Sequence, residues 1–113
     1  MRQSMHLHHN PFSLIKDGKK TIEMRVNDEK RRLMQIGDVI EFQDRETEEI
    51  IKAEIIQLYH FSNFEELLKS LDKEALGYSK DEIPNSKDLE KYYSLEEQEK
   101  YGVVGIEIKL VKE

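Results

Sequence analysis

The stretch of sequence that decides the fold runs from Pro11 to Arg25 and reads PFSLIKDGKKTIEMR. Its first half carries the signals that start and stop a helix. Asn10 is a typical N-cap residue, Pro11 suits the first helical position, and Gly18 is typical of the residue just past a helix end. The sequence therefore predicts a short helix near the N-terminus.

Directly after this helix, residues 21–26 alternate in polarity, as a half-buried strand does. The apolar positions are Ile22, Met24 and Val26. The polar positions are Thr21, Glu23 and Arg25. Because successive side chains of a strand point to opposite faces, we expect the three polar groups to lie side by side on one face of a sheet.

The remaining elements follow from the same kinds of pattern. Apolar and alternating runs predict an opening strand near residues 6–8 and further strands at 39–43, 50–61 and 103–111. Adjacent isoleucines at positions 55 and 56 indicate a β-bulge. Capping boxes at 62–65 and 94–97 predict two more helices, which end near Leu71 and Gly102.

Strands near both ends of the chain with helices between them predict an α+β fold. We expect a small β-barrel of about five to six mostly antiparallel strands, with a short N-terminal helix and helices inserted before the last strand. The last strand should pair back toward the first half of the chain. With 113 residues, the chain has the size of one domain, which we expect to span residues 1–113.

Charge is distributed unevenly along this acidic chain. The net charge is −6, but residues 16–32 contain seven basic and four acidic side chains, so this segment carries +3. A local basic strip on an acidic body favours a small or structured anionic ligand over non-specific coating of long polyanions. The alternative is a solvated surface segment with no ligand.

Absences narrow the classes of function that we expect. The chain has no cysteine, which excludes disulfides, thiolate metal sites and a cysteine nucleophile. It also lacks a run of eighteen apolar residues and an apolar start, so we expect a cytoplasmic protein with no membrane partner. No phosphate-binding glycine loop, serine-hydrolase elbow or zinc-protease motif occurs, and no cofactor is expected.

Three blocks of the sequence resemble the ASCH family. They are residues 11–25, 37–42 and 101–106, in the order that the family has them. The family's signature, G-x-K-x-x-E-x-R, is matched by residues 18–25. This resemblance implies a PUA-like barrel whose cleft is lined by the signature and binds RNA.

The signature residues have the chemistry that such binding needs. Arg25 offers a planar fork of donors, Lys20 offers a mobile point charge, and Glu23 can orient the guanidinium or accept from a base. Thr21 belongs to the same set of expected ligand-binding residues. The alternative is an ion pair between Glu23 and Arg25 that only stabilises the barrel, worth under about 1 kcal/mol if exposed.

A bacterial branch of the family removes the acetyl group from N4-acetylcytidine, and this resemblance implies an alternative function as an amidohydrolase. The branch's lysine and adjacent threonine match Lys20 and Thr21, but its nucleophilic threonine falls at Glu23. Catalysis would then require Lys20, Glu23 and an acid from the helical insertion, for which Glu74 is the nearest candidate.

Aromatic and histidine residues raise two further hypotheses. Tyr93 and Tyr101 flank the last helix, where they could stack on a base or cap the core. His6, His8 and His9 cluster near the N-terminus, but two or three imidazoles without a further ligand do not make a closed zinc site, and no metal is expected.

The leading hypothesis from the sequence is a module that binds RNA, a nucleotide or a modified nucleoside. The amidohydrolase is the alternative, and a protein-interaction domain that uses its acidic helices is a third reading. Specificity depends on the shape of the cleft, which local spacing does not encode. The sequence does not predict an oligomeric state.

Overall fold

The structure is a computed structural model that describes residues 2–112. Within these residues the chain forms five strands, which are β1 (Arg2–Leu7), β2 (Ile22–Val26), β3 (Val39–Asp44), β4 (Ile50–Phe61) and β5 (Val103–Leu110). Three α-helices accompany them, which are α1 (His9–Lys16), α2 (Phe64–Ser70) and α3 (Leu95–Tyr101). Short 3-10 turns, η1 (Arg31–Leu33) and η2 (Ser86–Leu89), lie in the connections.

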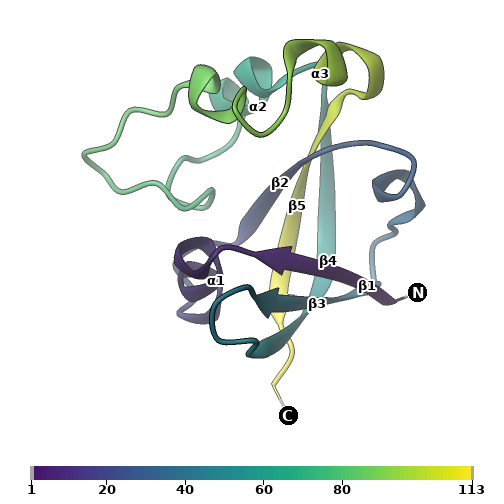
Figure 1. Cartoon of the computed structure of the whole chain (residues 1–113), viewed down its shortest axis with the longest axis vertical. Helices are drawn as coiled ribbons and strands as arrows, with labels where there is room; N and C mark the ends of the chain where they lie inside the picture. The colour runs from purple at the N-terminus through teal and green to yellow at the C-terminus, as the bar shows by residue number, and fades with distance from the viewer. Residues whose placement is uncertain (1, 113) are drawn as a thin grey trace.

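The five strands form one curled sheet in the order β1-β3-β4-β5-β2 (Figure 1). β1 pairs with β3 in parallel, and the other three pairings are antiparallel. The expected fold is therefore confirmed: the protein has an α+β fold built on a half-barrel of mostly antiparallel strands, and its last strand pairs with β2 and β4. The bulge at the two isoleucines is also confirmed, because the β4–β5 register shifts between Ile55 and Gln57.

Curling brings the two edge strands toward each other without joining them through backbone pairing in the described sheet. The gap is bridged by a side chain, since Nη2 of Arg25 on β2 donates to the His6 carbonyl oxygen on β1 at 3.5 Å. This open side of the half-barrel lies beside the segment that the sequence singled out.

Two apolar clusters fill the molecule. One lies inside the curled sheet, where alternate residues of β3 and β5, among them Phe42, Val104 and Ile106, are fully buried. The other lies between the sheet and α2 and includes Phe64 and Val103. Both faces of β5 are thus covered, so its first four residues are all buried.

Gly105 allows α2 and the chain after it to approach β5 closely. A Cβ atom at this position would lie 2.8 Å from Cδ1 of Leu71 and 3.4 Å from Cγ2 of Ile22. Real Cβ contacts do not occur at the shorter of these distances. The close packing of the helical layer on the sheet therefore depends on a residue without a side chain.

Helix ends follow the expected signals with two corrections. α1 begins two residues earlier than predicted, with His8 as N-cap, so Pro11 is its third residue, where a missing N–H is still tolerated. α2 is capped by Asn63, whose side chain accepts from the Glu66 backbone N–H, and not by a box that starts at Ser62. The box of Ser94 and Glu97 is present.

The start of α1 is tied to the end of β3 by an ion pair that gives a pH-dependent prediction. Nδ1 of His9 lies 2.6 Å from Oδ2 of the buried Asp44. The hydrogen bond and the charge of Asp44 raise the pKa of His9. Burial raises the pKa of Asp44, but His9 and the Glu46 backbone outweigh burial and lower this pKa to about 2.

His9 therefore stabilises the fold while it is protonated, and this contribution is lost as pH rises through its raised pKa. The contribution of Asp44 is lost only as pH falls toward about 2. We expect His9→Ala to lower the free energy of unfolding more at about pH 5 than at about pH 8.5 in denaturant titrations. His60→Ala, at an exposed histidine on β4, controls for loss of an imidazole. If the loss of unfolding free energy in His9→Ala is the same at both pH values, the prediction is wrong.

Every helix within residues 2–112 is too short or too polar to cross a lipid bilayer.

Candidate functional site

A buried carboxylate between two cations lies at the open side of the half-barrel. Oε1 of Glu23 is 2.9 Å from the Lys20 ammonium, and Oε2 of Glu23 is 3.1 Å from both Nε and Nη2 of Arg25. The strand periodicity of β2 places Glu23 and Arg25 on one face, and Lys20 reaches the same carboxylate from the loop after α1. We call these three residues the charged triad.

The triad is held in a largely dry environment. Glu23 is 5% exposed and Lys20 is 8% exposed. Burial alone raises the pKa of Glu23, but the charges of Lys20 and Arg25 outweigh burial and hold this pKa below its ordinary value. Glu23 is therefore ionised at neutral pH, and the triad carries one uncompensated positive charge.

The triad forms one wall of a cleft of about 420 Å³ between the edges of β1 and β2. The described residues that line this cleft are His6, Leu7, His8, Asn10, Pro11, Lys20, Glu23, Met24, Arg25, Arg45, Leu89, Tyr92 and Tyr93. Lys20, Arg25 and Arg45 are cations and Glu23 is the acid in this set, which gives the lining a charge of +2. The cleft is thus positive in a chain whose net charge is −6.

Arg31 adds another cation behind the triad. Its Nη1 atom is buried and has no hydrogen-bond partner among the described residues. Burial lowers the pKa of Arg31, and the positive charge of Arg25 lowers it further. Asp28 and Glu23 act in the opposite direction on this pKa, and Arg31 does not itself line the cleft.

Aromatic rings line the cleft on its helical side. Tyr93 packs against Phe64 with ring centroids 5.6 Å apart, and burial raises the pKa of its hydroxyl although nearby Arg25 lowers it. Tyr92 is 57% exposed at the rim, where its ring centroid lies 6.4 Å from that of His8 on the opposite wall. The rim therefore carries two exposed rings that lie next to each other with their planes tilted by 45°.

Other residues that the sequence singled out lie outside this cleft. Thr21 is exposed, and its backbone N–H and carbonyl bond to Ala75 and Ile108. Tyr101 lies at the end of α3, where Arg32 and Lys100 approach its ring at 5.9 and 5.1 Å. Neither residue lines the cleft.

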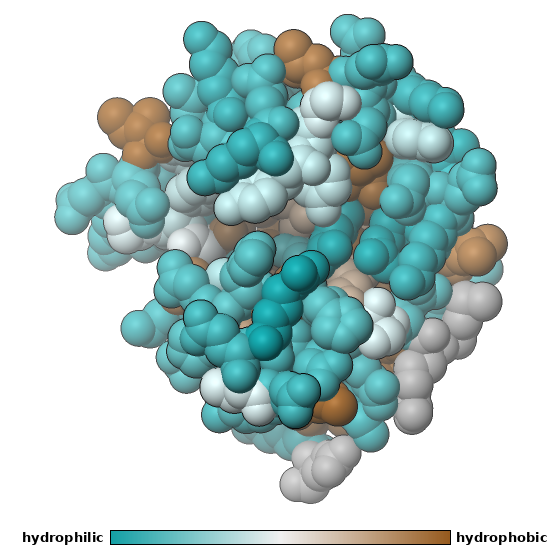
Figure 2. Space-filling view, viewed as in Figure 1, coloured by the Kyte–Doolittle hydropathy of each residue, from teal (hydrophilic) through white to brown (hydrophobic). Residues whose placement is uncertain are grey.

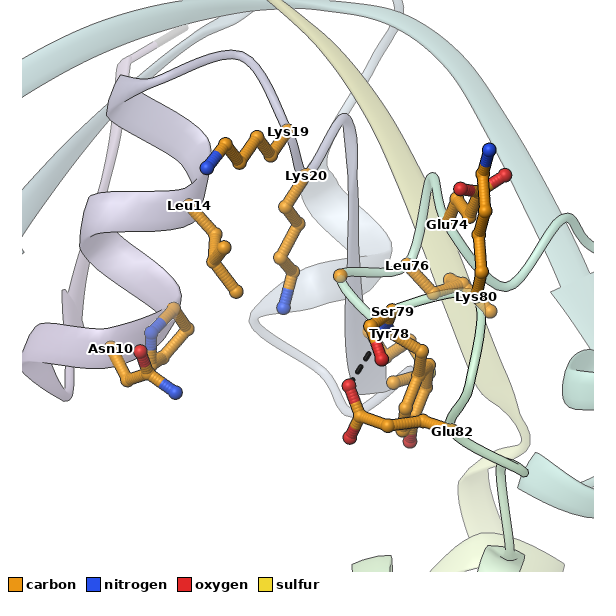
Figure 3. A pocket seen from close by; sticks show the side chains of 13 residues that line it. Asn10, Leu14, Lys19, Lys20, Glu74, Leu76, Tyr78, Ser79, Lys80 and Glu82 are labelled. Carbon is orange, nitrogen blue, oxygen red and sulfur yellow. Dashed lines mark hydrogen bonds between the residues drawn. The ribbon is translucent and has the colours of Figure 1, made fainter.

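Glu74 lines a second, adjacent cavity of about 820 Å³, which also contains Lys20. Figure 3 shows the Glu74 carboxylate beside Lys80, on the far side of this cavity from the Lys20 ammonium. The structure therefore brings Lys20, Glu23, Arg25 and Tyr93 together and leaves Thr21, Glu74 and Tyr101 apart from them.

Arg45 and His8 are two of the polar lining residues that sequence reasoning did not assign to the site. Arg45 follows β3, and the parallel pairing of β1 with β3 brings it to the cleft, where its backbone N–H donates to the Leu7 carbonyl at 2.9 Å. Because these two segments are far apart in the chain, no local pattern in the sequence indicates that they contact each other. His8 was visible as part of a histidine cluster, but its place opposite Tyr92 depends on the fold.

The histidines do not gather into a metal site in the described part of the chain. No group of three or more His, Asp or Glu side chains is placed there to hold an ion. His9 is instead paired with Asp44, as described above.

A curled, mostly antiparallel half-barrel with a polar cleft at its open side is the arrangement of a PUA-like domain. The ASCH domain model matches residues 5–112, which is nearly the whole chain. The chain therefore belongs to the ASCH domain family. No curated protein matches it in sequence.

Solved structures agree with this assignment. The chain is similar to the hypothetical protein PH0355, with 34% identity over 98% of this chain and 100% of that one, and a TM-score of 0.83. It is also similar to a protein from Pyrococcus furiosus, with 32% identity over the full length of both chains and a TM-score of 0.71. The ASCH structure from Zymomonas mobilis shares the fold, with a TM-score of 0.68 and 14% identity over 96% of this chain and 66% of that one.

Proposed function

We propose that the cleft between β1 and β2 binds RNA or a nucleotide. The observation that carries this proposal is the buried charged triad in a cleft whose lining has a charge of +2 on an acidic protein. Buried cations are kept in proteins where they are paired or serve a ligand. Here one carboxylate serves two cations, so positive charge remains for a phosphate group.

Within this proposal Glu23 is a positioning residue. Its two oxygens already accept from Lys20, from Arg25 and from the Met24 backbone N–H at 3.2 Å. Glu23 thus holds the two cations in place, and their remaining N–H groups contact the ligand. Arg45 on the opposite wall contributes a third cation. Arginine and lysine are the side chains that bind phosphate most strongly.

The aromatic rings at the rim provide a place for the base. Tyr92 and His8 are exposed at the rim as a tilted pair with ring centroids 6.4 Å apart, and bases of any identity can stack on the outer face of such a ring. Tyr93 lies deeper, next to Arg25, and supports this wall. A phosphate on the triad and a base at the rim together describe a nucleotide.

The amidohydrolase alternative has less support from the same geometry. No serine or threonine hydroxyl is among the described residues that line the cleft. The pKa of Glu23 lies below its ordinary value, which makes this carboxylate a weak general base. Glu74 stands across the second cavity from Lys20. These positions favour binding of an anion over deacetylation of a neutral nucleoside.

The experiment that tests the proposal measures binding of a short single-stranded RNA and of a pyrimidine nucleoside 5′-monophosphate to the intact protein. We expect both to bind, and we expect Arg45→Ala to weaken their binding by about tenfold or more, as loss of a charged hydrogen bond does. Lys109→Ala, at an exposed lysine of β5 outside the cleft, is the matched control and should change affinity less than about twofold.

The proposal fails if neither ligand binds the intact protein. Incubation with N4-acetylcytidine runs in parallel, with mass spectrometry as the readout. Release of cytidine and acetate, and loss of that activity in Lys20→Ala, would support the amidohydrolase instead. Absence of both binding and turnover would favour a domain that contacts another protein.

A further inference from the structure

The second cavity adjoins the cleft and shares part of its wall. The two cavities have Asn10, Pro11, Lys20 and Met24 in common. Figure 2 shows a hollow across the middle of this face, with less hydrophilic residues at its floor and hydrophilic residues along its rims. Both volumes, about 420 and 820 Å³, fall in the range of sites for small ligands.

Lys20 stands where the two cavities meet. Its ammonium pairs with Glu23 in the cleft, while its aliphatic stem rests against Gly77 of the second cavity. A Cβ atom at Gly77 would lie 3.1 Å from Cδ of Lys20, and the backbone there has a φ of +101°. The wall of the second cavity at Gly77 therefore packs closely against the Lys20 side chain. Glycine at this position avoids a clash with that side chain and adopts the positive φ without strain.

The outer wall of the second cavity is held in place by hydrogen bonds. The Lys73 ammonium donates to the carbonyl oxygens of Lys80 at 2.7 Å and Glu82 at 2.8 Å. One Glu82 carboxylate oxygen accepts from the Ser79 backbone N–H at 2.7 Å (Figure 3). These bonds fix residues 79–82 as a preformed rim, which lowers the entropy cost of binding.

This cavity shares part of the chemistry of the cleft, although the carboxylates of Glu74 and Glu82 also line it and its lining, Lys20 included, carries a charge of +1. It has cations of its own in Lys19 and Lys80, both exposed, and an aromatic ring of its own in Tyr78. In Figure 3 the ammonium of Lys20 projects into the space between these elements. A phosphate at Lys20 would therefore have room for a nucleotide on each side.

We infer that the natural ligand is a single-stranded RNA of two or more nucleotides, with one nucleotide in the cleft, the next in the Tyr78 cavity, and the phosphate between them at Lys20. This inference rests on the proposed function and extends it from a mononucleotide to a strand. Lys19 and Lys80 then contact the second phosphate and Tyr78 supports the second base.

The test compares ligands of one, two, three and six nucleotides, all with a 5′-phosphate, on the intact protein and on the double variant Lys19→Ala/Lys80→Ala. We expect affinity to rise by about tenfold or more from one nucleotide to three, because each stacked base and each phosphate contact adds to binding. The double variant should lose this gain and bind the mononucleotide as tightly as the unaltered protein does.

Salt dependence gives an independent readout. For single strands, the slope of log affinity against log salt is about 0.7 per phosphate contact, so the double variant should show a flatter slope with the three-nucleotide ligand. Lys109→Ala/Lys112→Ala removes the same number of charges from exposed positions near the C-terminus and should leave both affinity and slope unchanged.

Two results would overturn the inference while the proposed function stands. One is equal affinity for one and for several nucleotides. The other is a double variant that loses affinity for the mononucleotide and for the oligonucleotides to the same degree. That result would mean that the two lysines act only through the overall electrostatic potential of the protein. If no ligand of any length binds, the proposed function itself has failed and the inference fails with it.

Discussion

Glu23→Ala is expected to lower the free energy of unfolding by about 3–5 kcal/mol, because it leaves two buried cations without their carboxylate. Lys20 is 8% exposed, and Arg25 is also largely removed from water, so solvent cannot replace the lost partner. Urea titration followed by circular dichroism measures the change. Glu23→Gln keeps the shape and removes the charge, so most of the loss should persist in that variant.

Glu65 is the matched control for this prediction. It pairs with Lys69 at 3.2 Å, but both side chains are 65% exposed. Glu65→Ala should therefore cost less than about 1 kcal/mol, as exposed pairs do. The triple variant Lys20→Met/Glu23→Leu/Arg25→Met should recover much of the stability lost in Glu23→Ala. If Glu23→Ala lowers the free energy of unfolding no more than Glu65→Ala does, the charges of the triad are as well solvated as an exposed ion pair and the prediction is wrong.

Phe64→Ala is expected to have a similarly large effect on stability and an additional effect on binding. The Phe64 ring is fully buried between α2 and the sheet, and truncation of such a ring costs about 3–5 kcal/mol. It also supports Tyr93, whose ring centroid is 5.6 Å away and whose hydroxyl lies near Arg25. Without this support the aromatic wall of the cleft should shift, so ligand affinity should fall.

Phe42 is the control that separates the effect on stability from the effect on ligand affinity. It is equally buried, but it lies in the core cluster inside the sheet, which does not contain Tyr93. Phe42→Ala should therefore cost as much stability as Phe64→Ala. The milder variants Phe64→Leu and Phe42→Leu keep the protein folded for binding measurements. Equal loss of RNA or nucleotide affinity in both leucine variants would refute a specific link between Phe64 and the cleft.

The fold could be predicted in some detail because its signals are local. The limits of β4 at residues 50–61 follow from one long run rich in β-branched, aliphatic and aromatic residues, and the neighbouring isoleucines at 55 and 56 mark the bulge. Glycine at 102 ends α3 with a left-handed φ of 73°. The predicted start of α1 was wrong by two residues, because helix ends are the least precise part of a prediction from local signals.

The site could be predicted only where it lies on one strand. Glu23 and Arg25 were placed together by the two-residue period of β2, and Lys20 by its position in the family signature. Arg45 comes from the end of β3, and Tyr92 and His8 meet from opposite walls of the cleft. No spacing in the sequence relates these residues, because the contacts form between segments that are far apart in the chain.

The sequence by itself determined the elements, the apolar faces that drive them together, and the three charged side chains that share a short segment. Periodicity and capping depend on neighbours within a few residues, so one chain read in order is enough to see them. The tertiary structure alone decided that β1 and β2 face each other unpaired, that Tyr93 and not Tyr101 lies beside the triad, and that a second cavity adjoins Lys20. Those features arise from how the sheet curls and where loops pack, and this depends on contacts between distant residues.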